Sequence, residues 1–420
     1  METNKSKMAK VPNLRFPGFE GEWARKKLGE LAEFKVTNSF SRENLNYKSG
    51  TVKNIHYGDI HTKFATLFDV TMENVPYINA DIPINRILDD YYCQEGDIIF
   101  ADASEDLEDV GKTIEIVNLN NEKLLSGLHT LLARPKSDYF QKGFTGYLFK
   151  SQTVRLQIKK EAQGTKVLSI NVGRITNVEL SFPSILEQQK ITSFLAIIDR
   201  RIVTQIKIIE NLQTLMLGLG ERLFSQKVRF KNDNGNEFSC WKLKKGNDVF
   251  RNVSNKEHNS DLPILAITQD YGAIPRDLIE YQISVTEKSI ESYKVVEIGD
   301  FIISLRSFQG GIEYSNYKGI CSPAYIILRA KKNIDNRFFK HYLKTQNYIK
   351  LLNLKLEGIR DGKMISYKYF SDISLPCPSI EEQTKIADFS TAINEKIEIE
   401  KILLQQYKIQ KKYLLQKLFI

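Results

Sequence analysis

The sequence predicts two mixed α/β domains joined by two long α-helices that pair as an antiparallel coiled coil with pseudo-twofold symmetry. Three observations predict this architecture. The chain repeats itself, each repeat ends in a long heptad pattern, and the front part of each repeat alternates short β-rich runs with turn residues. The 420 residues suffice for two to four domains at about 100–200 residues each. Each such domain is large enough to bury its own core.

The repeat is clearest in its rear part. The segment LSFPSILEQQKI at 180–191 matches LPCPSIEEQTKI at 375–386, at an offset of 195 residues and without gaps. In the front part the offset drifts, and Trp23 aligns with Trp241. A constant rear part indicates a shared scaffold, whereas a divergent front part indicates two differently shaped binding surfaces.

Each rear segment begins a long helix. The pattern Pro-Ser-x-x-Glu at 183–187 and at 378–382 predicts a capping box just before an apolar run. Positions spaced alternately by four and three are apolar in nine of ten cases after the first box and in seven of ten after the second, which is typical of a coiled-coil seam. The residues predicted to pair are Ile191, Leu195, Ile198, Ile202, Ile209, Leu212, Leu219, Leu223, Ile386, Ile393, Ile397, Leu404, Leu414 and Leu418.

The second seam is weaker because Ser390, Glu400 and Lys411 interrupt it. Gln205 and Glu400 occupy the same slot in the two helices. They either fix the register or are tolerated polar residues, and the sequence leaves both readings open. About 34 helical residues span roughly 50 Å. If the helices pair, the second returns toward the first domain, so the pair is antiparallel; the alternative is two amphipathic helices, each packed on its own domain.

These helices set the predicted domain boundaries. We expect a first recognition domain at 1–183, a spacer helix at 184–227, a second recognition domain at 228–377 and a second spacer helix at 378–420. The β-rich runs in the front parts are Thr51–Ile60, Gly96–Ala101, Leu124–Arg134, Asp261–Thr268, Asp300–Leu305 and Ala324–Arg329. A helix is predicted near Tyr139–Glu161 and another near Asp335–Leu356.

Positive charge is concentrated at two places. The chain carries 60 Lys and Arg against 51 Asp and Glu, for a net charge of +9, which suits a polyanionic partner. Residues 134–174 hold nine basic residues, and residues 329–368, at the same offset, hold eleven. Each peak includes a glycine-bearing loop, at 163–166 and at 358–363, of the kind that brings backbone amides and lysines close to phosphates. A single charge run is usually a solvated helix face, but its duplication favours phosphate contacts.

Candidate base-reading residues lie in the divergent front parts, since Arg, Gln, Asn and Ser on loops read base edges in the major groove. The acidic run 102–109 is awkward beside DNA, although a carboxylate can accept from cytosine N4. We expect most of these acids to be solvated loop residues. The candidate DNA-binding residues are Asp102, Ser104, Lys112, His129, Lys166, Arg174, Gln269, Tyr271, Arg276, Arg306, Ser307, Gln309, Arg360, Lys363 and Lys368.

The sequence offers no catalytic motif. Val110-Gly111-Lys112-Thr113 resembles the end of a phosphate-binding loop, but Asp106 stands where the loop requires glycine. No nuclease or methyltransferase motif is present, and His56 and His61 are expected to be structural. The four cysteines have no metal-binding spacing, which predicts free thiols in a reducing cytoplasm. No secretory signal and no membrane span is expected.

The duplicated segment LPxP-SI-x-EQ-x-KI, each copy opening a long helix, resembles the specificity subunit of type I restriction-modification systems. ADASEDLEDVGKT and GLHTLLARP in the first half, and GAIPRD in the second, are similar to segments of its recognition domains. The resemblance implies two target-recognition domains that each read one half of a split DNA site, held apart by an antiparallel coiled coil. It also implies a subunit without catalytic site or cofactor of its own.

The resemblance further implies partners. Modification subunits, two in number, would carry S-adenosylmethionine and methylate adenine, and translocating restriction subunits would use ATP and Mg²⁺. Two other function classes are weighed against this interpretation. A stand-alone nuclease or methyltransferase is disfavoured by the missing motifs. A coiled-coil adaptor for proteins, without sequence-specific DNA binding, is disfavoured by the duplicated basic peaks.

Overall fold

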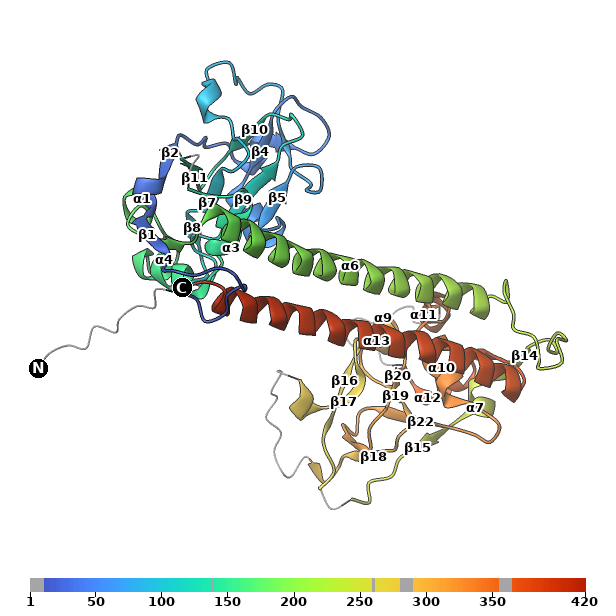
Figure 1. Ribbon diagram of the computed structural model, residues 1–420. Coiled ribbons are helices and arrows are strands. Elements are labelled where there is room, and N and C mark those ends of the chain that lie inside the picture. Colours follow the sequence, from blue (N-terminus) through green and yellow to red (C-terminus); the bar gives the residue numbers. More distant parts are fainter. Residues whose placement is uncertain (1–10, 137–138, 259–260, 280–289, 355–364) are drawn as a thin grey trace, which may run out of the picture. The chain divides into compact units, whose positions relative to one another are not determined.

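The computed structural model describes residues 11–136, 139–258, 261–279, 290–354 and 365–420. These form two compact units: unit 1 comprises Met1–Gln205 with Leu403–Ile420, and unit 2 comprises Ile206–Ile402. Two long helices, α6 (Ile185–Phe224) and α13 (Ile380–Lys417), each contribute to both units (Figure 1). The predicted domain boundaries lie at the ends of the long helices, whereas the two compact units divide within these helices. The domain boundaries stay a prediction.

Unit 1 is built on a five-stranded sheet in the order β2-β11-β7-β9-β5. Its strands are β2 (Ala32–Lys35), β11 (Thr130–Pro135), β7 (Ile98–Ala101), β9 (Thr113–Asn118) and β5 (Leu67–Asp69). The pairs are antiparallel except β5 with β9. All four residues of β7 are buried, as expected for a central strand covered on both faces.

The described part of unit 1 also contains three smaller sheets. The strands β10 (Leu124–Ser126), β4 (Lys53–Ile55), β6 (Tyr77–Ile78) and β3 (Leu45–Asn46) form a four-stranded sheet, and β1 (Ala24–Lys27) pairs with β13 (Glu179–Phe182) and β8 (Ala103–Ser104) with β12 (Leu168–Ser169). The short helices of unit 1 are α1 (Leu28–Leu31), α2 (Tyr57–Thr62), α3 (Phe144–Leu148), α4 (Gln152–Glu161) and α5 (Val172–Ile175).

Unit 2 repeats this plan in reduced form. Its four-stranded sheet runs β15 (Phe250–Val253), β22 (Ile326–Ala330), β19 (Phe301–Ile303) and β20 (Glu313–Tyr314), and further pairs are β14 (Lys242–Lys245) with β23 (Ser374–Cys377), β16 (Leu265–Thr268) with β17 (Gly272–Pro275), and β18 (Lys294–Val296) with β21 (Gly319–Cys321). The short helices are α7 (Gly246–Val249), α9 (Ser307–Gly310), α10 (Asn336–Tyr342), α11 (Gln346–Asn353) and α12 (Tyr367–Ser371). The mixed α/β class with two copies and two long helices is therefore confirmed.

Some predicted elements differ from the structure. The run Thr51–Ile60 is a strand only over β4, because His56 caps the N-terminus of α2 by accepting from the Gly58 amide. The single helix expected near Tyr139–Glu161 is two helices, since Ser151 caps α4 and accepts from the Val154 amide. Thr345 likewise caps α11 and separates it from α10. In each case a polar side chain offers the backbone a new N-cap.

The predicted seams are protected from solvent. All fourteen residues predicted to pair are buried or half-buried, and so are the interrupting Ser390, Glu400 and Lys411. In unit 1, Leu195 near the start of α6 shares one apolar cluster with Leu414 at the end of α13. In unit 2, the cluster that contains Ile386 near the start of α13 also takes in the last residue of α6, Phe224. Within each unit, the end of one helix thus packs beside the start of the other, as in an antiparallel pair.

The Glu-Gln pair of the repeated motif pins each long helix to its unit. In unit 1, Arg15 donates two hydrogen bonds to Glu187, both 2.8 Å long. The Gln188 amide donates to the carbonyls of Tyr139 and Pro183, each at 2.9 Å. The capping-box prediction is only partly right, because this glutamate binds an arginine. Because the Glu187 and Gln188 side chains are buried and hydrogen-bonded to residues outside α6, they fix where this helix starts in unit 1.

Unit 2 repeats the anchor. Arg229 donates to both carboxylate oxygens of Glu382, at 3.0 and 2.8 Å, and the Trp241 indole donates to the same carboxylate at 2.9 Å. The Gln383 amide donates to the Pro378 carbonyl at 2.9 Å. Here Ser379 does act as the N-cap, accepting from the Glu382 amide at 3.3 Å.

Candidate nucleic-acid interface

In unit 1, the candidate reader His129 lies beside the ring of Tyr57. The His129 ring lies edge-on to it with centroids 5.3 Å apart, and the His61 ring does the same at 5.8 Å. His129 Nδ1 lies 3.2 Å from Asp102 Oδ1, and burial raises the pKa of that carboxyl. His129 has φ +54°, a left-handed conformation that few non-glycine residues adopt, although His is among the more tolerant. The structure thus joins Asp102 and His129 in one partly exposed donor–acceptor pair.

Two carboxylates of the acidic run beside this pair form ion pairs with lysines. The Lys112 ammonium donates to Asp109 at 3.1 Å and to the His61 carbonyl at 2.6 Å, so this candidate holds its own loop together. Glu108 pairs with Lys159. Ser104 accepts from the Asp106 amide at 3.0 Å. Glu105, Asp106 and Glu108 are exposed, which agrees with the expectation of solvated loop acids. The two ion pairs lower the electrostatic cost of placing this loop near a polyanion.

His56 has a structural role, as the sequence indicated. Its Nδ1 accepts from the Gly58 amide at 3.2 Å, and burial, aided by nearby Arg42, lowers its pKa to about 4. The folded state therefore excludes a proton that the unfolded state binds below pH about 6.5. His56 stabilises the fold fully above that pH, and its contribution is lost as the pH falls toward 4.

We accordingly expect unit 1 to lose about 1–3 kcal/mol of stability between pH 7 and 4.5 through His56. His56→Asn keeps an N-cap acceptor and should flatten this part of the pH dependence. Urea unfolding at both pH values, followed by Trp23 fluorescence in a Trp241→Phe background, measures it. His258→Asn in unit 2 is the control, and an unchanged pH slope in His56→Asn would refute the assignment.

In unit 2, the candidates lie on two loops. Gln269 and Tyr271 are exposed at the β16–β17 turn. A Cβ added at Gly310 of α9 would lie 2.7 Å from the Gln269 side chain, so the second loop, with exposed Arg306 and Gln309, adjoins the first. Arg276 is half-buried, and its Nη1 has no partner among the described residues. The two loops form one polar surface.

The remaining candidates differ in whether their side chains are free to contact a ligand. Ser307 is 1% exposed, and its hydroxyl accepts from the Ser304 amide at 2.9 Å, so it shapes the loop. Arg174 donates to the Glu161 carbonyl at 3.1 Å, whereas Lys166 and Lys368 are exposed. Arg360 and Lys363 lie outside the described residues.

The two basic peaks are partly consumed inside the units. Arg134 binds both oxygens of Asp97, each at 2.9 Å, and Arg329 binds Asp300 in the same way, each at 2.7 Å. These arginines anchor strands and do not face a ligand. Duplication of the peaks therefore reflects, in part, duplication of internal ion pairs, which corrects the prediction that the peaks contact phosphates throughout.

Sequence reasoning missed the Arg-Phe pairs that precede each domain. Besides the bonds of Arg15 and Arg229, Phe16 packs edge-on against Phe194 at 5.5 Å, and Phe230 against Phe389 at 5.6 Å. The available signal was the recurrence of Arg-Phe upstream of both tryptophans. In the part of the chain that the structure describes, no His, Cys, Asp and Glu group suits a metal ion, and no helix has the length and apolarity to cross a membrane.

Comparison with known proteins agrees with this duplicated architecture. A family model described as "Type I restriction modification DNA specificity domain" matches residues 20–213 and 240–408. The chain belongs to this family. Both halves, each with its sheets and its part of a long helix, are therefore copies of one specificity domain.

Two relatives from Methanocaldococcus jannaschii are named as type I restriction enzyme specificity subunits. One, MjaX, is 28% identical over 336 residues, which is 76% of each chain, and the other, MjaVIII, is 26% identical over 289 residues, covering 63% of this chain and 67% of the relative. The S subunit of a type I restriction-modification system from M. genitalium has a similar fold, with a TM-score of 0.58 at 16% identity over 98% and 99% of the two chains. A second solved chain from a type I system gives 0.56 at 16% identity over 96% and 98%.

Proposed function

We propose that this chain is the DNA specificity subunit of a type I restriction-modification complex. Each specificity domain reads one half of a bipartite duplex site and directs adenine methylation or restriction by partner subunits. The observation that carries the proposal is the match of the family model to both halves of the chain. The front parts of the two units differ in their sheets and loops, which supports two unlike half-sites.

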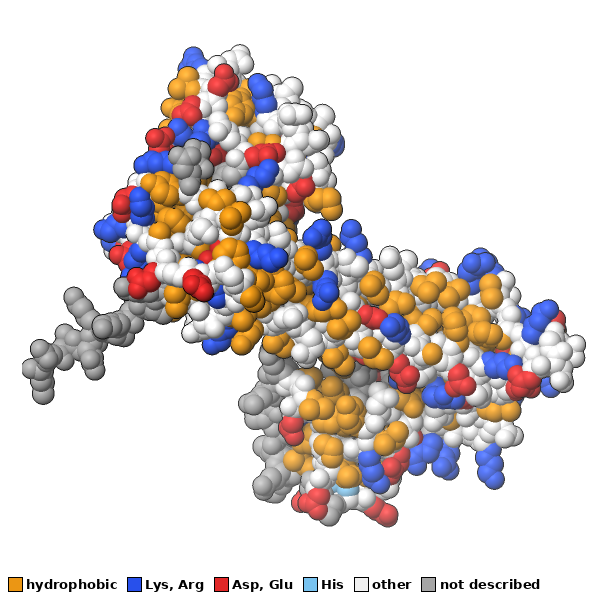
Figure 2. Space-filling model, in the orientation of Figure 1, with side chains coloured by type: hydrophobic (Ala, Val, Ile, Leu, Met, Phe, Trp, Pro, Cys, Tyr) orange, Lys and Arg blue, Asp and Glu red, His pale blue; other side chains and the backbone are white. Residues whose placement is uncertain are grey.

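Partner subunits supply the chemistry in this proposal. Two modification subunits bind S-adenosylmethionine, and restriction subunits use ATP and Mg²⁺, whereas this chain contributes recognition. Supporting evidence for protein partners lies on α6, where apolar side chains such as Ile197, Leu215 and Leu217 are exposed, and Figure 2 shows apolar side chains among charged ones on the long helices. Exposed apolar surface of this kind is typical of protein interfaces. A location in the cytoplasm stays a prediction.

Duplex binding should be steeply salt-dependent. Each phosphate contact contributes a slope of about −0.9 to the logarithm of affinity against the logarithm of salt concentration. We expect the full chain with its modification subunits to bind a cognate duplex more tightly than a scrambled one, with both affinities falling as salt rises. Fluorescence anisotropy measures this, and equal affinity for all duplexes would favour the protein-adaptor alternative instead.

A further inference from the structure

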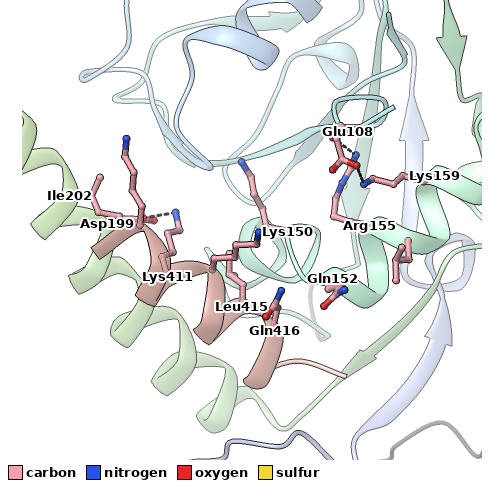
Figure 3. A pocket seen from close by; sticks show the side chains of 13 residues that line it. Glu108, Lys150, Gln152, Arg155, Lys159, Asp199, Ile202, Lys411, Leu415 and Gln416 are labelled. Carbon is pink, nitrogen blue, oxygen red and sulfur yellow. Dashed lines mark hydrogen bonds and ion pairs between the residues drawn. The ribbon is translucent and has the colours of Figure 1, made fainter. Parts of the chain in front are cut away.

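Unit 1 contains a basic groove of about 620 Å³ between α4, α6 and the end of α13 (Figure 3). We define the groove by its six basic lining residues, which are Lys150, Arg155, Lys159, Lys408, Lys411 and Lys412. Two acidic residues, Glu108 and Asp199, also line it. The lining therefore carries an excess of four positive charges at neutral pH, which attracts an anion.

Half of these cations are engaged internally. Lys411 pairs with Asp199, and Lys159 pairs with Glu108. The Arg155 guanidinium donates to backbone carbonyls of the 108–111 loop at 2.8–3.0 Å. Among the described residues, Lys150, Lys408 and Lys412 have neither an ion pair nor a side-chain hydrogen bond. These three ammonium groups remain for a bound anion.

Lys150 lies at the centre of the groove, where its side chain is half-buried (Figure 3). Burial, together with the nearby charges of Lys411, Lys112 and Arg155, lowers its pKa to about 8, against the opposing effect of Asp199. Removing an ammonium group from water without pairing it with a counter-ion is costly. An anion bound beside it would supply that charge and raise the pKa again.

The groove is joined to the candidate readers by one short loop. Arg155 ties the Gly111 carbonyl to the groove wall, while the neighbouring Lys112 reaches the His61 carbonyl. His61 and His129 both pack on Tyr57. The same loop therefore contacts both the groove wall and the element that carries His61. In a duplex, phosphates flank the base edges.

We propose that the basic groove binds the phosphodiester backbone of the duplex that unit 1 reads, with Lys150, Lys408 and Lys412 contacting phosphates. The inference rests on the proposed function. It is specific to unit 1, because the 195-residue offset places Thr345 at the position of Lys150, and Gln213 and Leu217 at those of Lys408 and Lys412. An acidic protein surface is the other class of occupant; the shared loop with the readers favours the duplex.

The test compares Lys150→Met/Lys408→Ala/Lys412→Ala with the wild-type chain in complex with modification subunits, by anisotropy over a salt series. We expect the salt slope to fall by about 2–3 and the affinities for cognate and scrambled duplexes to fall by the same factor. Lys160→Ala is the matched control, since Lys160 is exposed on α4 outside the groove. Lys408→Ala/Lys412→Ala alters only exposed residues and keeps the test valid if the triple variant misfolds.

A pH series gives an independent readout. Wild-type affinity should decline as the pH rises through about 8, because free Lys150 then loses its proton. Lys150→Arg stays charged and should bind with a flatter pH profile, whereas Lys150→Met should bind weakly at every pH. A purely structural lysine would produce neither pattern.

Three outcomes overturn the inference. The first is an unchanged salt slope in the triple variant. The second is Lys150-dependent binding of tripolyphosphate without any effect on duplex binding, which assigns the groove to a free polyphosphate. The third is loss of modification-subunit assembly with normal duplex binding, which assigns it to a protein. Equal affinity of the wild-type complex for cognate and scrambled duplexes would instead refute the proposed function. The same salt series shows separately whether the salt slope of duplex binding depends on Lys150.

Discussion

Exchanging residues 13–150 for the matching segment of another specificity subunit should change one half of the methylated site and leave the other half intact. Unit 1 has its own sheets and its own apolar core, so its reading surface is independent of unit 2 in this proposal. The expected effect is complete replacement of one half-site. Methylome sequencing of cells that carry the exchanged chain measures it directly.

The structure shows how the exchange must be built. Arg15 binds Glu187, Trp23 packs edge-on against Phe419 at 6.3 Å, and the Tyr147 hydroxyl donates to Asp199 at 2.8 Å. The exchanged segment must keep these three residues, because their partners lie outside it. Without them a loss of methylation would report misfolding and not specificity.

A matched control lengthens both long helices by one heptad. This insertion keeps the seam in phase and should alter the spacing between the half-sites without altering either sequence. A change in both half-sites after exchange of residues 13–150 would contradict the two-reader assignment.

Removing the anchor carboxylate of unit 2 should cost about 3–5 kcal/mol, as expected when one partner of a buried ion pair is deleted. Glu382 is fully buried and Arg229 is 18% exposed in its side chain. Glu382→Ala would leave the Trp241 indole without its acceptor and the Arg229 guanidinium without its counter-ion, with only the Ser239 carbonyl remaining among its hydrogen-bond acceptors in the described residues. Urea unfolding followed by Trp241 fluorescence, in a Trp23→Phe background, reports on unit 2.

Two variants make this prediction sharp. Glu381→Ala removes an exposed carboxylate from the same helical turn and should change stability by less than about 0.5 kcal/mol. Arg229→Met/Glu382→Leu removes both charges and should recover much of the loss, because no buried charge is left unpaired. Equal stability of Glu382→Ala and the wild-type chain would show that the anchor is dispensable.

Much of the architecture was predictable because it depends on local periodicity. The capping boxes and the alternation by three and four predicted one long helix after each box, and α6 and α13 are these helices. The seam positions are buried or half-buried. Lys411 shows why a polar residue is tolerated there: it pairs with Asp199 and lies over the Tyr147 ring at 5.7 Å. That compensation comes from two other elements, so the seam pattern alone could not reveal it.

The candidate site was less predictable. Asp102 and His129 meet directly, but the His129 ring also packs on Tyr57, a contact that residue spacing could not indicate. Arg134 and Arg329 belong to the predicted basic peaks, yet each binds an aspartate that immediately precedes a neighbouring strand. A linear sequence shows that a charge is present, but its partner depends on strand pairing between distant segments.

By itself, the sequence determined the duplication, the two long helices and the membership of both halves in one kind of domain, because repeats and heptads are written in residue spacing. The tertiary structure alone decided which charges remain free. Lys150, Lys408 and Lys412 face one groove without ion partners among the described residues, while Arg155 and Lys159 beside them are engaged. The physical reason is that a charge is neutralised by whatever the fold brings within a few ångströms of it, and that distance depends on long-range packing.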